Sequence, residues 1–431
     1  MRNKQAIIRL FIANTISGFA QGLSMLAIPW YFVDILEQPV LWGSIYLAVN
    51  AISLFWGLYA GTLVDRFNRK NIFLAETSIG TIWLLSIAAF GFYFGHVPIF
   101  LAGLVFATTF FTYNIHYPAL YAFVQEITDK EHYSRITSYL EIQGQITNVT
   151  AGGLGAILLA GIQSGEQSLL GWQFNIPFSI EAWSLHEVFL LDGCTYLLSF
   201  FLIFPIHYQA VAIRKKEKSH LVKRFKVGVQ FLKENSLVFI FGNAAYFVFV
   251  VTMLLNFVLM PNFVKSYLHA GAGVFALSDM AFSLGAVFSG LSIAYFFRNA
   301  SRVLGSIIMT CVTATCLFVL VFYRGEMGFY LIMVFFGLAN SGSRIMRVTY
   351  MFTHVPNQVL GRVQSIFQII NVLLRMAFIA ICSSVFFIEN IHYSFGLLGA
   401  CCLVAAAILT YYYKDLVNLK IKEQSKTSLP S

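Results

Sequence analysis

Long apolar runs recur along most of this 431-residue chain. A helix of about 20 apolar residues crosses the roughly 30 Å of hydrocarbon in a bilayer, and a helix satisfies its own backbone polar groups there. Only 11% of the residues are charged, against about a quarter in a soluble domain. The runs therefore predict an all-α membrane protein. We expect twelve transmembrane helices, near residues 7–33, 41–63, 71–94, 98–124, 135–162, 187–206, 237–264, 274–297, 302–323, 328–353, 362–388 and 392–413.

These runs divide the chain into two six-helix domains. We expect an N-terminal domain over 1–206, a basic cytoplasmic linker over 207–236, a C-terminal domain over 237–413 and a cytoplasmic tail over 414–431. The linker is interpreted as a solvated connector that faces lipid headgroups, with a regulatory partner site as the alternative. The fifth and tenth runs contain the most polar side chains and define their helices least clearly.

The distribution of Lys and Arg predicts the orientation of the helices. If the N-terminus is cytoplasmic, 23 of the 28 Lys and Arg residues lie on the cytoplasmic side, and only Lys265 and Arg324 lie in external loops. Cytoplasmic loops are enriched in these residues. Both termini are thus predicted to be cytoplasmic. The net charge of +9 is explained by the bilayer, so it indicates no nucleic-acid partner.

The two halves resemble each other at one loop. Arg135 and Ser138 follow the fourth run, and Arg362 and Ser365 follow the tenth with the same spacing, 227 residues later. Repeated halves are typical of secondary transporters, whose substrate binds near the midplane between the repeats.

The loop between the second and third runs carries a family resemblance. The sequence GTLVDRFNRK over residues 61–70 closely resembles the signature loop of the major facilitator superfamily. That resemblance implies alternating access and a set of gating residues in this loop and in the matching loop of the second half. These are Gly61, Asp65, Arg66, Arg69, Lys70, Gly361 and Arg362.

Three shorter stretches resemble the macrolide-efflux and enterobactin-exporter branch of that superfamily. They begin at Tyr117-Pro118, Leu191-Asp192 and Val355-Pro356. This resemblance implies a monomer in a bacterial inner membrane that exports a small amphipathic molecule, either a siderophore or a drug-like compound. Drug exporters often carry a Gly-Pro pair in the fifth helix, whereas residues 151–155 contain no proline.

Polar residues line one face of the fifth run. Glu141, Gln145, Asn148 and Gly152 are spaced by four, three and four residues, which places them on one side of a helix. This face either lines a cavity or packs against a polar neighbour. Glu141 is the candidate acid for proton coupling.

The second half carries three arginines inside apolar runs: Arg344, Arg347 and Arg375. Arginine stays charged in proteins, and charges inside membrane spans usually mark pathways or partners. One interpretation is a buried ion pair with Glu141, Asp279 or Asp192, and another is that the first two arginines point to the cytoplasm. Because the arginines outnumber the acids placed to pair with them, we predict a substrate with an anionic group.

Other polar residues are given supporting roles at this stage. Asp279 completes the set of candidate pathway residues, and Asp192 is interpreted as structural. Glu76 is expected to reach headgroups or water, and His116 to be a packing residue.

No motif indicates an enzyme. The sequence shows no phosphate-binding loop, zinc pair or nucleophile–base set, so we predict no catalytic residues, metal or cofactor, and a proton gradient as the energy source. The alternatives are uptake by the same fold and a non-transporting membrane sensor or scaffold.

Overall fold

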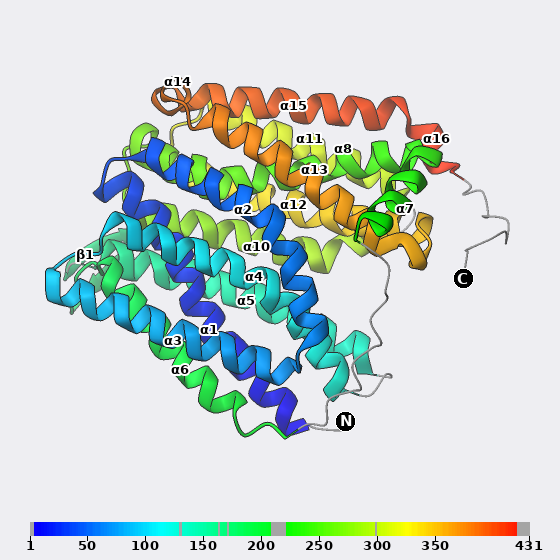
Figure 1. Ribbon diagram of the computed structural model, residues 1–431. Helices are drawn as coiled ribbons and strands as arrows, with labels where there is room; N and C mark the ends of the chain where they lie inside the picture. Colours follow the sequence, from blue (N-terminus) through cyan, green and yellow to red (C-terminus); the bar gives the residue numbers. More distant parts are fainter. Residues whose placement is uncertain are drawn as a thin grey trace.

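The computed structural model describes residues 4–128, 132–162, 164–169, 172–207, 221–297 and 300–419. Helices account for nearly all of this part of the chain and run lengthwise through one bundle (Figure 1). The membrane-crossing helices of the first half are α1 (Lys4–Trp30), α2 (Pro39–Arg66), α3 (Arg69–Phe94), α4 (Ile99–Ile127), α5 (Tyr133–Ala160) and α6 (Leu185–Ile203). Those of the second half are α8 (Ser236–Leu254), α10 (Ala272–Phe296), α11 (Arg302–Phe322), α12 (Glu326–His354), α13 (Asn357–Cys382) and α15 (Ile391–Tyr411).

The predicted class of all-α membrane protein with two six-helix halves is confirmed. Eleven helices in the described residues are long and apolar enough to cross a bilayer. The twelfth, α5, is 28 residues long but more polar, as expected of the fifth run.

A β-hairpin adds the one sheet of the described chain. Strands β1 (Gly165–Leu169) and β2 (Trp172–Ile176) pair antiparallel, with Gly165 opposite Ile176. The hairpin lies at one end of the bundle, which we call the hairpin end, and the start of α1 and the end of α15 lie at the other, the terminal end (Figure 1). Two short helices, α14 (Val385–Glu389) and α16 (Tyr413–Val417), flank α15.

The first helix of each half ends in the same way, which is strong structural evidence for the repeat. After α1, the wider turn η1 (Tyr31–Ile35) is closed by a bond from Gln38 N to Phe32 O at 2.8 Å. After α8 come η3 (Leu255–Leu259), α9 (Met260–Asn262) and η4 (Phe263–Tyr267), closed by a bond from Ala270 N to Val264 O at 2.9 Å. Glu37 and His269, at matching positions, have positive φ values of 54° and 52°.

The two halves contact each other through α5 against α10 and α2 against α13. These contacts gather toward the hairpin end, and the halves diverge toward the terminal end (Figure 1). Gly152 of α5 makes the close crossing possible, because a Cβ there would lie 2.7 Å from the backbone nitrogen of Met280. Small residues let membrane helices approach in this way.

Part of the predicted linker belongs to the C-terminal half. Residues 221–234 form α7 (Leu221–Glu234), which packs against α13. Phe231 and Leu232 are buried there, and Gly228 lies beside Arg362. The interpretation of the whole interval as a solvated connector is therefore wrong for α7, while residues 208–220 lie outside the described chain.

Candidate functional site

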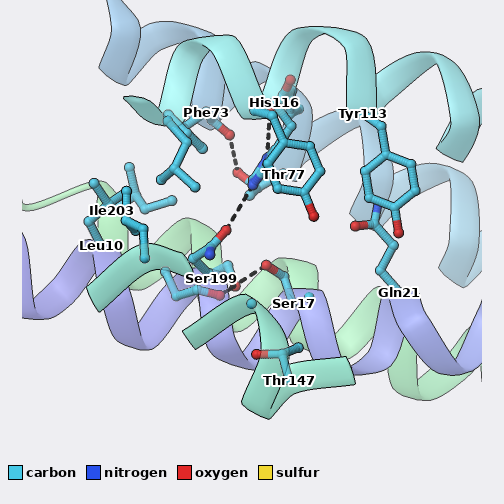
Figure 2. A pocket seen from close by; sticks show the side chains of 18 of the residues that line it. Leu10, Ser17, Gln21, Phe73, Thr77, Tyr113, His116, Thr147, Ser199 and Ile203 are labelled. Atoms are coloured by element: carbon cyan, nitrogen blue, oxygen red, sulfur yellow. Dashed lines mark hydrogen bonds and ion pairs between the residues drawn. The ribbon is translucent and has the colours of Figure 1, made fainter. Parts of the chain in front are cut away.

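A polar cavity lies within the first half, between α1, α3, α4, α5 and α6 (Figure 2). Its volume is about 60 Å³, which is room for a few water molecules. Hydrogen-bonding side chains from all five helices line it. They are Asn14, Ser17, Gln21, Glu76, Thr77, Tyr113, His116, Tyr117, Tyr121, Thr147, Asn148, Tyr196 and Ser199.

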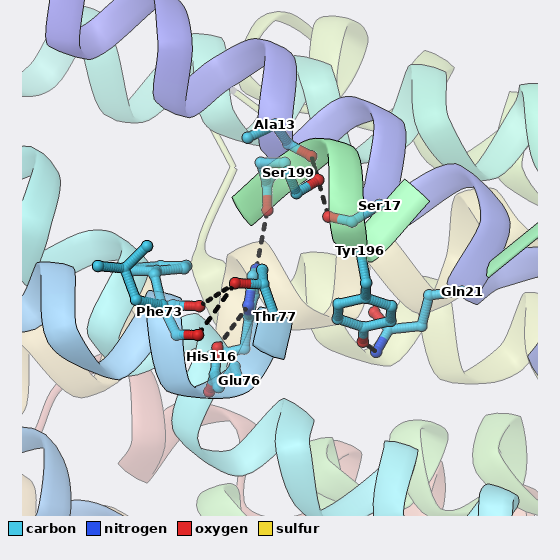
Figure 3. Close-up of polar contacts among 11 residues, drawn as sticks. Ala13, Ser17, Gln21, Phe73, Glu76, Thr77, His116, Tyr196 and Ser199 are labelled. Atoms are coloured by element: carbon cyan, nitrogen blue, oxygen red, sulfur yellow. Dashed lines mark hydrogen bonds and ion pairs between the residues drawn. The ribbon is translucent and has the colours of Figure 1, made fainter. Parts of the chain in front are cut away.

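His116 connects three helices at the centre of this cavity. Its Nδ1 lies 3.2 Å from Glu76 Oε2, and its Nε2 lies 2.8 Å from Asn14 Oδ1 (Figure 3). The side chain of Glu76 is only 10% exposed, and its Oε1 is buried without a hydrogen-bond partner. The expectation of a mere packing role for His116 is thus wrong, and of the two expected environments of Glu76, headgroups or water, only water in this cavity fits its position. The two residues form a buried acid–base pair.

A second set of hydrogen bonds joins α1 to α6. Gln21 Nε2 donates to Tyr196 Oη at 2.9 Å (Figure 3), and one turn further Ser24 Oγ donates to Asp192 Oδ2 at 2.6 Å. Asp192 is completely buried. Its contact with Ser24 fits the supporting role inferred from sequence.

The second half contributes charge to the interface between the halves. Arg375 lies seven residues before the end of α13 and Asp279 seven residues after the start of α10, so both lie about 10 Å from the hairpin end. The Arg375 guanidinium faces the Phe110 ring of α4, 5.9 Å from its centroid. The Tyr113 hydroxyl of α4 interacts electrostatically with Asp192 and Asp279. Tyr113 thereby links the polar cavity to the interface.

Arg375 is buried without a counter-charge. The residue is 5% exposed, and its Nε has no hydrogen-bond partner. In the described part of the chain, no carboxylate pairs with it. The alternative of an ion pair with Asp279 or Asp192 is therefore wrong for Arg375, and the third possible partner, Glu141, has its side chain outside the described residues.

Aromatic rings and one ion pair join the halves at the hairpin end. Trp42 of α2 donates through Nε1 to the carbonyl of Phe257, and Trp30 stacks on Phe275 with ring centroids 5.5 Å apart. Lys265 forms an ion pair with Asp34 across the interface. Phe110, which faces Arg375, joins this aromatic cluster through Tyr46 and Trp42.

Comparisons with known proteins agree with this architecture. The family model of the Major Facilitator Superfamily matches residues 10–379. The chain belongs to the Major Facilitator Superfamily. Membership indicates a transporter and not an enzyme. No curated protein matches the chain.

Solved structures share the fold at low sequence identity. A point mutant of the nucleoside transporter NupG superposes with a TM-score of 0.71 at 13% identity, covering 95% of this chain and 100% of that one. A bacterial homologue of the iron transporter ferroportin, in an inward-facing state, gives 0.68 at 13% identity, with 94% and 98% covered. A D-xylose–proton symporter gives 0.67 at 15% identity, with 94% and 97% covered. These likenesses establish the major facilitator fold alone.

The major facilitator loop between α2 and α3 ties helix ends together. Arg69 Nε lies 3.7 Å from Glu126 Oε1 at the end of α4, and its Nη1 donates to Phe67 O at 2.7 Å. Asn68 caps α3 by accepting from Lys70 N at 2.9 Å. Arg66 lies over the Phe67 ring.

The remaining loop residues are placed unevenly. Lys70 lies over Phe204, and Arg362 lies beside α7. A Cβ at Gly361 would meet open space. The side chains of Gly61 and Asp65 lie outside the described residues, so their gating roles stay predictions.

The polar face predicted on α5 is divided. Asn148 lines the cavity, Gly152 packs on α10, and Gln145 is half-buried without lining the cavity. The side chain of Glu141 lies outside the described residues. Gln143, which the spacing did not select, instead donates to Thr15 Oγ1 at 2.6 Å.

The two arginines of α12 also differ. Arg347 is 8% exposed, with its guanidinium 3.7 Å from the centroid of the Tyr246 ring of α8. Arg344 is exposed. Burial inside the bundle thus applies to Arg347, and for the exposed Arg344 the alternative that it points to the cytoplasm stays a prediction.

Sequence reasoning missed the polar face of α1. Asn14, Ser17, Gln21 and Ser24 are spaced by three, four and three residues, the same helical pattern that was used for α5. All are neutral, and only charged groups prompted a search in the first half. The spacing was sufficient to find this face.

Proposed function

We propose that this protein is a secondary transporter that exports a small amphipathic molecule with an anionic group, at the expense of the proton gradient. The observation that carries the proposal is that Arg375 is buried at the interface of the halves and has no counter-charge among the described residues. A siderophore or a drug-like acid has the required chemistry.

Burial makes the Arg375 charge a strong attractor for anions. The guanidinium remains protonated, and its attraction for a negative group rises as the surrounding dielectric constant falls. The rings of Phe110 and Tyr46 lie around it. They would pack on the apolar part of a substrate whose anionic group pairs with the guanidinium.

The contacts between the halves support a transport cycle of alternating access. The halves join at the hairpin end and diverge at the terminal end (Figure 1). The positive-inside pattern favours a cytoplasmic terminal end, so this arrangement would load substrate from the cytoplasm. The direction of export is inferred from the resemblance to efflux proteins, and uptake would use the same site.

A matched pair of probes tests the role of Arg375. The probes are a fluorescent amphipath that carries one carboxylate and its methyl ester. We expect Arg375→Gln to weaken binding of the acid by about ten- to a hundred-fold, because hydrogen bonds to charged groups contribute about 1.5–3 kcal/mol. Binding of the ester should change less than threefold.

Two controls make this test decisive. Arg324→Gln removes an exposed arginine at the hairpin end and should change neither affinity. Equal loss of both probes with a lower unfolding temperature would identify Arg375 as a structural residue. Accumulation of the acid in cells with and without the gene, repeated with an uncoupler, tests the direction and the energy source.

A further inference from the structure

We propose that Glu76 and His116 form the proton-binding site that couples transport to the proton gradient. This inference rests on the proposed function in that it assumes proton-coupled transport. It assigns the coupling to a pair that the sequence reasoning did not consider, in place of Glu141.

The contacts of His116 define how many protons the pair holds. Asn14 presents its Oδ1 to Nε2 at 2.8 Å, and this contact is a hydrogen bond when Nε2 carries a proton and donates it. The other ring nitrogen faces a carboxylate oxygen of Glu76 at 3.2 Å. A second proton must lie on one of these two atoms, since two unprotonated atoms would repel. The pair is therefore neutral, either as imidazolium and carboxylate or as imidazole and carboxylic acid.

Loss of one proton leaves a net negative charge and forces a rearrangement. The remaining ring proton must move to Nδ1 to satisfy the Glu76 carboxylate, and Nε2 then becomes an acceptor. The Asn14 amide must rotate to donate its NH₂ group to Nε2. The protonation state is thereby transmitted to α1, and the released proton passes to water in the cavity.

The surroundings favour exchange of a proton at this pair. Glu76 is 10% exposed, and its second oxygen, Oε1, is buried without a hydrogen-bond partner. A carboxylate is costly in such a place unless it is paired or protonated. The 60 Å³ cavity beside the pair has room for the water that carries the proton.

The titratable groups that face the cavity come from three of its helices. Among the described lining residues, α1 and α5 present neutral groups, and α3 presents Glu76. Helix α4 presents His116, and four lining residues are tyrosines, a type that ordinarily titrates near pH 10. They are Tyr113, Tyr117 and Tyr121 of α4 and Tyr196 of α6. In this set Glu76 is the one carboxyl group and His116 the one imidazole.

A series of polar groups extends from the pair toward the interface between the halves. Tyr196 accepts the hydrogen bond from Gln21 and interacts electrostatically with Glu76 and Asp192. Tyr113 interacts in the same way with Asp192 and Asp279. Tyr196, Asp192 and Tyr113 thus lie between Glu76 and Asp279 of α10, at the interface between the halves.

The first test needs no substrate. The protein in lipid nanodiscs, with ¹⁵N-labelled histidine, is titrated from about pH 5 to about pH 9, the range in which histidine exchanges protons. Nuclear magnetic resonance follows the His116 ring, assigned by its loss in His116→Asn, and infrared spectroscopy follows protonated carboxyl groups. We expect both signals to titrate together, and the His116 titration to shift by more than one pH unit in Glu76→Gln.

Two results of this titration would overturn the proposal. One is a His116 ring that does not titrate, or that titrates identically in Glu76→Gln. The other is a response of these signals to Na⁺ in place of H⁺. Glu181→Gln removes an exposed carboxylate of the same half and should leave the titration unchanged.

The second test uses transport of the carboxylate-bearing amphipath by reconstituted vesicles. We expect Glu76→Gln to retain exchange of this probe without a gradient. When a pH gradient drives transport, the variant should accumulate at least tenfold less probe than the unmodified protein. Glu141→Gln should retain that accumulation, and the opposite pattern would refute the assignment. If the unmodified protein does not move the probe, the proposed function fails on its own, and the titration still decides the proton site.

Discussion

Asp192 illustrates the effect of one hydrogen bond on a buried charge. Its side chain is inaccessible to solvent, and its Oδ2 accepts a 2.6 Å bond from Ser24 while Oδ1 has no partner. The hydrogen bonding of the Asp192 carboxyl group therefore depends on a single hydroxyl group. We therefore expect the loss of stability on removing one partner to differ measurably from the loss on removing both.

We predict that Ser24→Ala destabilises the protein by about 1–3 kcal/mol, because it leaves a buried carboxylate unsatisfied. The double variant Ser24→Ala/Asp192→Leu should be less destabilised than Ser24→Ala alone. Unfolding in detergent, followed by circular dichroism, measures both. Ser44→Ala is the control, since that exposed hydroxyl bonds only to Val40 O in its own helix. A double variant less stable than the single one would contradict the argument.

Individual roles were harder to predict from sequence than helices were. His116 was assigned to packing because its partner Glu76 is 40 residues away, and no local pattern reveals that contact. Arg344 and Arg347 share a helix face by spacing, yet one is exposed and the other buried. Residues on one helix face are buried only where a neighbouring helix covers them, and the sequence of the helix itself does not show how far that cover extends.

At the scale of elements, the close crossing of α10 and α12 depends on two glycines. A Cβ at Gly285 would overlap the carbonyl of Val334, and a Cβ at Gly337 would overlap the carbonyl of Phe282. Backbone atoms cannot move aside as a flexible side chain can. The two helices thus meet through reciprocal contacts of glycine with backbone.

We predict that Gly285→Ala and Gly337→Ala each destabilise the protein by about 1–3 kcal/mol, the usual cost of overpacking. Gly290→Ala in the same helix α10 is the matched control, because a Cβ there meets nothing within 4 Å. That change should be neutral or stabilising by up to about 1 kcal/mol, since alanine favours the helix. Thermal unfolding of the three variants measures these differences in stability. Equal unfolding midpoints for all three would show that α10 and α12 can move apart to accommodate the added Cβ without cost.

The elements themselves followed from hydropathy with few exceptions. Twelve membrane helices are read directly from apolar runs because the bilayer requires that length. Helix α7 was missed because its lysines and arginines suggested a solvated segment, although Val227, Phe231 and Leu232 recur at helical spacing. The paired turns η1 and η4 carry no sequence signal that we recognised.

At the scale of the whole molecule, one ion pair bridges the halves at the hairpin end. Lys265 and Asp34 have side chains 40% and 24% exposed, and such a pair contributes about 0.2–1 kcal/mol. That energy changes a two-state population by a factor of about 1.4 to 5. The pair therefore shifts the population modestly toward the state closed at this end and does not hold it closed by itself.

We predict that Asp34→Asn shifts the protein toward the state open at the hairpin end, by up to about fivefold. Spin labels at Tyr93 and Phe322, exposed at this end of α3 and α11, report the distance between the halves. High salt should reduce the difference between the variant and the unmodified protein, because salt screens exposed charges.

The controls for this prediction separate the pair from general charge effects. The swap Asp34→Lys/Lys265→Asp should restore the original distance distribution. Glu389→Gln neutralises another exposed carboxylate at this end and should leave the distribution unchanged. An Asp34→Asn distribution identical to that of the unmodified protein would rule out a role for the pair.

The docking of α7 on α13 has a consequence for how the molecule can be divided. Since α7 moves with the second half, the covalent connection between the halves reduces to the thirteen residues 208–220, which can span at most about 45 Å. A break in the chain there would separate two polypeptides, each with its six membrane helices, the second with α7 still in place. Their recognition would rest on the non-covalent contacts between the halves, chiefly those of α2, α5, α10 and α13, so the gene could be split at this point and the transporter reassembled from two products in the membrane.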